Sequence, residues 1–354
     1  MAAVLLLCLT PLFAEPSQND SNSSTRSVTP VEDLTGLSLE ELYNLDVIQL
    51  NVIGGHTHPA GQKMLGYEFM FMDMDGHRSG TDHVSVSDIL KQGFAAASTG
   101  MTAEEHMAEI MYAPTNDLTL MAMLPVKHME MDMKAPSNPI NQRRFTEVSD
   151  GIGDLEILAL YTFLGSVTRG QRLILNAGMS FPTGSIDEEN TIFGIRSRLE
   201  YNMQLGSGTF NLIPGLTYLG ESKKCAWGAQ GLSTVRLGRN GNGYRYGNQY
   251  ELMGWLGYAV TDWFAPSLRI DGRAWGNVHG ADAAIDPTFD AEGDPHRQGG
   301  RRVDVLAGTN FYVPNGVLKG IRLSLEAGLP VYESLNGPQL STRWLFSAGL
   351  TYSF

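Results

Sequence analysis

The sequence is poor in charged residues, in basic residues above all, and in cysteine. Only 18% of its 354 residues are charged, and the formal net charge is −13. Nucleic acids are bound by clustered Lys and Arg, so this acidic balance argues against a nucleic-acid partner. An acidic protein can instead attract cations. Two cysteines give little basis for a disulfide framework.

Long apolar runs are also missing. The apolar stretch at residues 2–13 is too short to span a bilayer as a helix, which needs about 20 residues. It ends at Ala14 and is followed by the polar sequence EPSQNDSNSS. This arrangement is typical of a signal peptide with its cleavage site. We therefore expect residues 1–14 to direct export and to be removed.

The segment from residue 15 to residue 62 is expected to be a periplasmic lead. Residues 15–33 are rich in Ser, Asn and Thr, a composition that cannot bury enough apolar surface to order itself. The following LTGLSLEELYNLDV predicts one short helix over residues 38–46, because Ser38 and Glu41 have the spacing of a capping box. This stretch resembles the start of the plug in TonB-dependent receptors. The long plug domain does not follow, so energy-coupled uptake is not expected.

Glycine and aromatic residues are abundant. Forty Gly, thirteen Tyr and fourteen Phe favour many strands and turns over packed helices. From about residue 63 onward, apolar and polar residues alternate in segments separated by short turns or by longer polar connections such as residues 280–300. In the clearest segment, residues 191–205, one face carries Phe193, Ile195, Leu199, Tyr201, Met203 and Leu205. Such strands, with short turns at one end and long loops at the other, are typical of a transmembrane barrel.

The last ten residues, LFSAGLTYSF, alternate in the same way and end on Phe354. They resemble the C-terminal strand by which outer-membrane barrels are recognised, so the barrel-assembly machinery and outer-membrane lipid are expected partners. We predict an all-β, antiparallel transmembrane β-barrel over residues 63–354, in the bacterial outer membrane. A closed barrel with both chain ends in the periplasm needs an even number of strands. The segments predict about 12, within a range of 12–14.

Methionine and histidine are concentrated at the start of the predicted barrel. Twelve of the sixteen methionines fall between Met64 and Met133, and six of the eight histidines lie in nearly the same window. Side chains alternate along a strand, so lipid-facing Tyr67, Ile110 and Leu120 imply that the methionines of three adjacent strands face the lumen. The candidate metal ligands are Met70, Met72, Met74, Met107, Met111, Met121, Met123, His77, His83 and His128.

Several interpretations of this cluster remain open. Thioethers bind Cu(I) and related soft ions, and imidazole suits Cu(II) and zinc, so the cluster could pass or hold copper. Methionine also fills irregular apolar space, so the same row could pack against the N-terminal helix or receive an apolar ligand. Asp73, Asp75 and Asp82 invite a calcium interpretation, although the twelve-residue EF-hand spacing is not present.

Charged residues on the inner rows of the predicted strands are the candidate pore-lining residues. Such charges can set pore selectivity, or they can simply solvate and cross-link the interior. They are Glu68, Glu109, Arg196, Arg198, Arg269, Asp271, Arg273, Arg322 and Glu326. Four tryptophans fit the aromatic girdles of a membrane barrel, namely Trp255, Trp263, Trp275 and Trp344.

Catalytic motifs are not found in the sequence. G-x-S-x-G does not occur, and EEHMAE lacks the second histidine of H-E-x-x-H. An enzyme is therefore not predicted, and no catalytic residues are proposed.

Several segments, in order along the chain, carry a family resemblance: GGHTHPAGQKMLGYEFMFMDMDGHRSGTD, IMYAPTNDLTLMAMLP, SDGIGDLEILALYTF, GYRYGNQYEL, TDWFAPSLR, WGNVHGAD, NFYVPNG and GLPVYESLNGPQL. They resemble transporter-like outer-membrane proteins grouped with the meta-pathway of phenol degradation. The resemblance spans about residues 52–354. It implies a bacterial outer-membrane barrel, without implying phenol as the substrate.

These observations together predict a passive channel or transporter component for a small solute, with copper as one candidate solute and the only candidate cofactor. The alternative is a non-transporting surface barrel that binds copper or a hydrophobic ligand.

Overall fold

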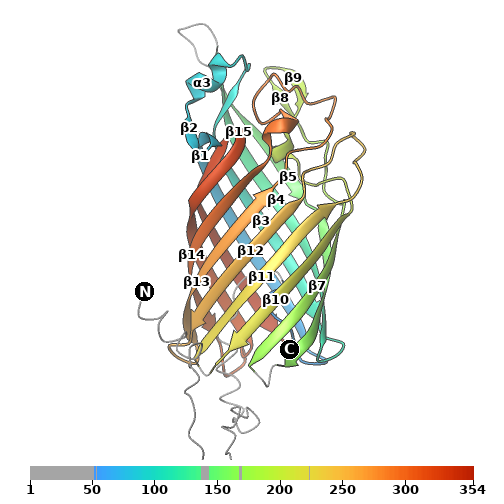
Figure 1. Cartoon of the computed structure of the whole chain (residues 1–354), viewed down its shortest axis with the longest axis vertical. Coiled ribbons are helices and arrows are strands. Elements are labelled where there is room, and N and C mark those ends of the chain that lie inside the picture. Colours follow the sequence, from blue (N-terminus) through green and yellow to red (C-terminus); the bar gives the residue numbers. More distant parts are fainter. Residues whose placement is uncertain (1–51, 53, 137–142, 167–169, 223) are drawn as a thin grey trace, which may run out of the picture.

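The chain folds into one closed antiparallel β-barrel (Figure 1). The computed structural model describes residues 52, 54–136, 143–166, 170–222 and 224–354. Each strand of the ring pairs with its neighbour in sequence, and the last pairs with the first. The ring is formed by β1 (Lys63–Gly80), β3 (Ala97–Tyr112), β4 (Leu118–Ala135), β6 (Leu155–Ser166), β7 (Gln171–Phe181), β10 (Asn211–Glu221), β11 (Cys225–Arg236), β12 (Gln249–Tyr258), β13 (Phe264–Trp275), β14 (Gly300–Tyr312) and β15 (Ile321–Ser353).

The element β15 contributes two passes across the barrel wall. Its 33 residues would extend for about 110 Å if they were straight, and its two halves have different neighbours. Arg322 to Leu335 pair with β14, whereas Leu335 to Ser353 pair with β1. Ser341 donates to the Glu333 carboxylate at 2.5 Å, so the element folds back between these two residues. Every pairing in the ring is antiparallel, which requires an even number of passes, and twelve satisfy this as the sequence predicted.

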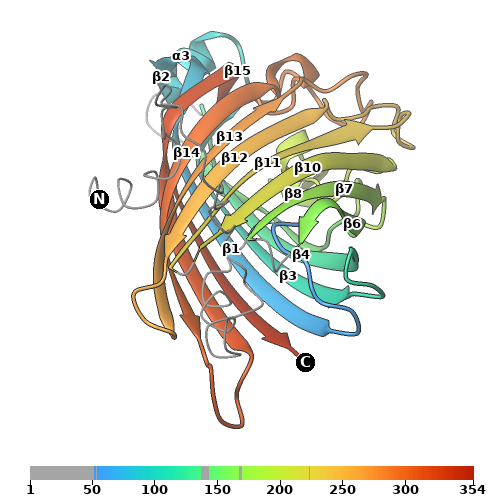
Figure 2. The same cartoon turned by 60° about the horizontal axis from the view of Figure 1, so that its bottom comes forward.

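The two ends of the barrel differ in the length of their connections. Residues 113–117 and 259–263 are short turns at the end where β1 begins and β15 ends, and Figure 2 brings this end forward. The opposite end carries long loops, as expected from the sequence (Figure 1). These loops and the margin beside them contain β2 (Asp82–Val84), α3 (Val86–Lys91), β8 (Glu189–Ile192), β9 (Ile195–Arg198), η3 (Tyr201–Met203) and η4 (Pro295–Arg297). The remaining strand, β5 (Arg143–Ile152), pairs with the loop-end half of β4, whose other half pairs with β6, so β5 and β6 are successive parts of one pass of the wall.

The predicted strand over residues 191–205 is wrong. Ile192 pairs with Ile195, and the two residues between them, Phe193 and Gly194, have φ of 51° and 84°. Two positive φ values in succession make a two-residue hairpin turn, so β8 and β9 form a separate sheet among the long loops. Arg196 and Arg198 therefore lie on this hairpin and not on a barrel strand. Arg196 is 79% exposed and pairs with Glu189.

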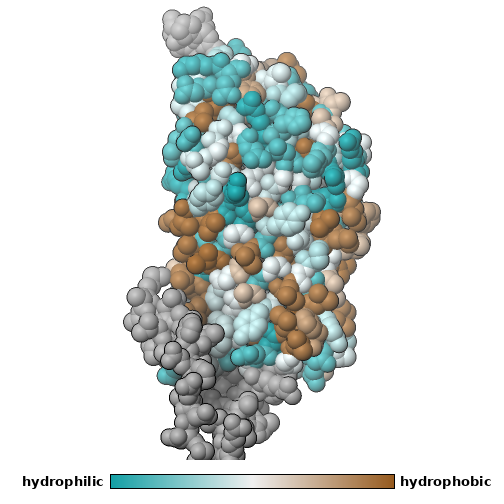
Figure 3. Space-filling view, in the orientation of Figure 1, coloured by the Kyte–Doolittle hydropathy of each residue, from teal (hydrophilic) through white to brown (hydrophobic). Residues whose placement is uncertain are grey.

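The outer surface of the barrel wall is apolar, and the loop end is hydrophilic (Figure 3). Tyr67, Ile110 and Leu120 are all more than 40% exposed, in agreement with their predicted lipid-facing positions. Trp263 and Trp344 are also exposed. Trp255 is an error in the predicted girdle, because its side chain points inward and is only 9% exposed. Its ring lies against Gly228, where a Cβ would come within 2.2 Å of the indole.

The described residues contain no helix that is both long enough and apolar enough to cross a membrane.

Candidate functional site

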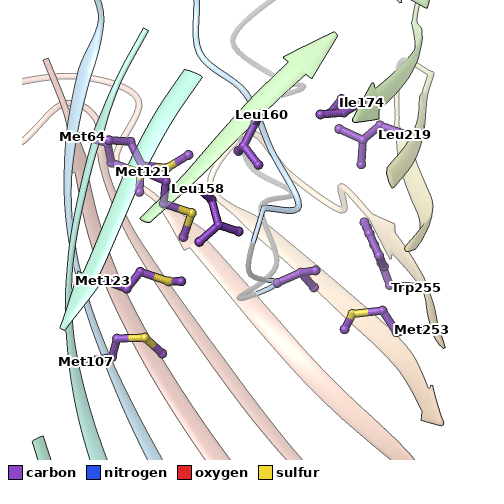
Figure 4. Packing of buried hydrophobic residues seen from close by; sticks show 12 residues of the cluster. Met64, Met107, Met121, Met123, Leu158, Leu160, Ile174, Leu219, Met253 and Trp255 are labelled. Carbon is purple, nitrogen blue, oxygen red and sulfur yellow. The ribbon is translucent and has the colours of Figure 1, made fainter. Parts of the chain in front are cut away.

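The lumen near the short-turn end is filled by apolar side chains. Met64, Met107, Met121 and Met123 project from one wall, and they face Leu160, Ile174, Leu219 and Trp255 on the other (Figure 4). Val52, which precedes the barrel, is 5% exposed and belongs to the same cluster. This end of the lumen is therefore packed.

Residues 54–62 continue this filling of the lumen. The backbone N–H of His58 donates to Thr119 Oγ1 at 3.1 Å, and Arg172 donates to Thr57 Oγ1 at 3.2 Å. Gly54 has φ of +65°, and a Cβ there would lie 2.8 Å from the Asn176 side chain. We call Val52 together with residues 54–60 the inner segment. The helix predicted over 38–46 lies outside the described residues.

Most of the methionines in the predicted metal set lie on the inner side of the wall. Met107, Met111, Met121 and Met123 are 1–6% exposed, and Met70 and Met74 pack at the edges of the two methionine-rich clusters. Cross-strand pairing aligns two rows of three, which are Met64, Met111 and Met121, then Met74, Met101 and Met131. Met72 is separate, because its sulfur accepts hydrogen bonds from Arg302 at 3.8 Å and Thr342 at 3.7 Å.

The three histidines of the predicted set do not join these methionines. His77 is 1% exposed and its Nε2 lies 2.8 Å from Ser98 Oγ. His83 is on the exposed strand β2, and the His128 side chain is 41% exposed beside Glu130. Among the described residues, no group of three His, Cys, Asp or Glu side chains is arranged to hold a metal ion.

The calcium interpretation is not supported by the surroundings of its aspartates. Asp73 and Asp75 both face Arg343, at 3.1 and 3.5 Å. A guanidinium beside two carboxylates supplies the charge that a calcium ion would otherwise provide.

A cavity of about 390 Å³ lies in the lumen above the packed region. Its lining mixes apolar and charged side chains, and Met70, Met107, Met129 and Met253 are among the apolar ones. The charged residues come from both parts of the wall, from β1, β3, β4 and β6 and from β12, β13 and β14. A second cavity, of about 360 Å³, shares Met70, Met107 and Glu156 with the first and extends to Tyr201 and Tyr246 in the loops. The two cavities are thus neighbours along the lumen.

The charged lining residues of β12 and β13 take part in ion pairs. Arg269 contacts Glu326 at 2.7 Å, and Arg273 contacts Asp271 at 2.7 Å and Glu251 at 3.2 Å. These predicted pore-lining residues therefore lie inside the barrel. Glu68 lines the same cavity, whereas Glu109 and Arg322 lie nearer the short-turn end, where Arg322 stacks on Tyr312.

Aromatic residues of the long loops lie over the second cavity. The rings of Tyr201 and Tyr244 are 5.0 Å apart, and those of Tyr244 and Tyr246 are 5.6 Å apart. Tyr246 donates to the carbonyl oxygen of Tyr201 at 2.6 Å, and Tyr201 Oη accepts from the Asp282 backbone N–H. We use the name loop cap for Tyr201, Tyr244 and Tyr246 together with residues 290–292.

Buried carboxyl groups join the loop cap to the barrel. Glu147, Glu200, Asp290 and Glu292 are each at most 3% exposed. Ser98 on β3 donates to Glu292 at 2.6 Å. Burial, and then the neighbouring Glu200, raises the pKa of Asp290, and burial raises the pKa of Glu292 to about 7. These carboxyl groups therefore stay protonated at pH values at which exposed carboxyl groups have lost their protons.

We expect the loop cap to open as the pH rises from 5 to 8. An exposed Glu titrates near 4.5 and the closed Glu292 near 7, so the closed cap binds more protons in this window and loses stability with rising pH. Hydrogen exchange of residues 286–298, expressed as protection relative to the intrinsic base-catalysed rate at each pH, should show lower protection at pH 8 than at pH 5. Glu292→Gln should reduce this pH dependence, and Glu130→Gln, on an exposed carboxylate, should not. Protection that is independent of pH in the natural chain would contradict this.

Sequence reasoning missed the inner segment and the loop cap. Both depend on contacts between residues far apart in the chain, such as Arg172 with Thr57 and Ser98 with Glu292. The sequence held one usable signal, because Tyr244 and Tyr246 lie in a Gly- and Asn-rich loop where exposed aromatic residues are not expected.

A closed antiparallel barrel with an apolar outer surface, long polar loops at one end and cavities in its lumen defines a bacterial outer-membrane β-barrel protein. The family model described as "Putative MetA-pathway of phenol degradation" matches residues 78–327, and the chain belongs to this family, as the sequence resemblance indicated.

The solved structure of an outer-membrane channel agrees with this fold. The COG4313 outer-membrane channel from Pseudomonas putida F1 aligns with a TM-score of 0.57 and 12% identity, over 86% of this chain and 100% of that one. The NanC porin aligns with a TM-score of 0.38 and 9% identity, over 83% of this chain and 99% of that one. A search of curated proteins found no match.

Proposed function

We propose that the protein is a passive channel for a small solute across the outer membrane. The observation that carries the proposal is the pair of neighbouring cavities, about 390 and 360 Å³, between the loop cap and the packed end of the lumen. Membership of the family and the fold shared with an outer-membrane channel are consistent with it. No catalytic activity is part of the proposal.

Passage would involve both ends of the lumen. A solute would enter when the tyrosines of the loop cap separate, and would rest in the cavities below Tyr201 and Tyr246. It would leave when the inner segment withdraws from the wall, which breaks the contacts of Thr57 and His58. The C-terminal strand that ends at Phe354 would bring the chain to the barrel-assembly machinery.

Planar bilayer recordings test this function. The full chain, reconstituted with its loop end on one known side, should give single-channel steps in salt solution, and these should become longer-lived at pH 8 if the loop cap opens. A barrel that inserts and resists protease but gives no steps, with or without residues 15–60, would overturn the channel and leave the non-transporting surface barrel.

Copper(I) is a second candidate, as solute or as bound ion. The observation that favours it is the cross-strand row Met64, Met111 and Met121, because neighbouring side chains across a sheet lie about 5 Å apart and three thioethers form a soft ligand set. The row is also fully packed, and packing alone explains its burial.

Competition titration with a Cu(I) chelator distinguishes these two roles of methionine. Bound copper should fall to background when Met64, Met111 and Met121 are changed to leucine together. Met253→Leu is the matched control, since Met253 belongs to the same apolar cluster on the facing wall. Equal copper binding by the triple variant and the control would assign the row to packing.

A further inference from the structure

The cavity lining has an excess of negative charge that its own bases do not neutralise. Seven acidic and three basic residues line the larger cavity. All three bases already have carboxylate partners, since Lys127 lies 3.8 Å from Glu105, and Arg269 and Arg273 are paired as described. No basic side chain of this lining is therefore left for an anionic solute.

Three carboxylates of the lining form no ion pair among the described residues. Glu104 is one of them, but it alternates with Ala103, which packs inside the barrel, so its side chain lies on the outer face and only the other two point into the lumen. Among the residues that the structure describes, Glu68 on β1 and Glu156 on β6 form no ion pair, although Arg269 and Lys127 line the same cavity. An unpaired carboxylate in a space of low dielectric strongly favours a nearby cation. The smaller cavity also contains Glu156, so this charge lies where the two cavities meet.

The same space offers apolar contact close to these carboxylates. Met70 and Met107 belong to the lining of both cavities, and Met129, Met253 and Leu306 extend the apolar surface of the larger one. Methionine is flexible and polarisable, so it fits apolar groups of different shapes. A volume of about 390 Å³ suits a molecule with one ring or a short chain.

We infer that the cavity selects small organic cations, with an ammonium group at Glu68 or at Glu156 and an apolar body on the methionine side chains. This inference rests on the proposed channel function, for which it names the solute class. A small hydrated ion would gain nothing from the methionines. A neutral aromatic molecule would leave both carboxylates without a partner, and an organic anion would meet the negative excess directly.

Binding and conductance are measured separately, so that the cation selectivity of the cavity and the channel function are tested independently. Calorimetry on the full chain in detergent should show saturable binding of benzyltrimethylammonium at pH 8 and at least about tenfold weaker binding of benzenesulfonate, which has the same ring and the opposite charge. In bilayers, the same cation should reduce the channel current at lower concentration than the anion. Changing Glu68 and Glu156 to Gln should reduce the preference for binding the cation over the anion to about twofold or less.

Glu130→Gln is the matched control, because this exposed carboxylate lies outside the cavity lining. It should keep the full preference. Binding of the cation without conductance would uphold the cavity's selectivity and remove the channel. Conductance with equal effects of the two probes, or a preference that survives loss of both carboxylates, would overturn the inference and leave the channel in place.

Discussion

A chain that begins at Gly61 should conduct at least about threefold more current than a chain that begins at Glu15, because conductance rises with the open cross-section of a pore. The truncation removes the inner segment and with it the contacts of Val52 in the apolar cluster, of Thr57 with Arg172 and of His58 with Thr119. Gly61 and Gln62 are kept because both form backbone hydrogen bonds with Ala113 at the first turn.

A second deletion separates the inner segment from the rest of the lead. Removing residues 15–48 shortens the chain by a comparable length and leaves the inner segment intact, so it should change the conductance little. The measurement is single-channel conductance in planar bilayers, with protease resistance as the check that both barrels are folded. Equal conductance of the two deletions would show that the inner segment does not close the pore.

Arg269→Met should destabilise the barrel by about 3–5 kcal/mol, because it leaves the buried carboxylate of Glu326 without a partner. The Glu326 side chain is 1% exposed, and Arg269 is the residue it pairs with, at 2.7 Å. Methionine is unbranched and close to arginine in length, so the effect reports loss of charge compensation more than loss of volume.

Urea unfolding from lipid vesicles gives the free energy for this comparison. The double variant with both Arg269 and Glu326 changed to Met should recover most of the loss, since no buried charge remains. Arg343→Met breaks the pair with Asp73, in which the arginine side chain is 62% exposed, and should cost at most about 1 kcal/mol. If Arg269→Met is no worse than Arg343→Met, the buried pair does not stabilise the lumen.

The barrel and the facing of its first strands could be predicted from the sequence because alternation is a local property. Each residue of β1, β3 and β4 points to the side opposite its neighbour, so the exposure of Tyr67 and Ile110 and the burial of Met111 and Met121 follow from one another. The even strand number followed from closure, which also explains why β15 counts as two passes.

The same alternation gave a wrong prediction where the backbone turns but the alternating sequence pattern continues. Phe193 and Gly194 continue the pattern of residues 191–205, yet their positive φ values form a hairpin outside the wall. Trp255 fits a lipid-facing girdle by residue type, but parity with Met253 turns it inward. Residue type and local alternation do not determine such positions. They depend on where the backbone turns and on which side of the wall each side chain then lies.

By itself, the sequence determined the class of fold, the inner row of methionines and the acidic balance. Only the tertiary structure decided what occupies the lumen: the inner segment at one end, the loop cap at the other, and between them cavities where Glu68 and Glu156 form no ion pair among the described residues. The physical reason is that strand pattern arises from neighbours in the chain. Ion pairs such as Arg269 with Glu326, and the absence of one at Glu68 among the described residues, arise from contacts across the barrel.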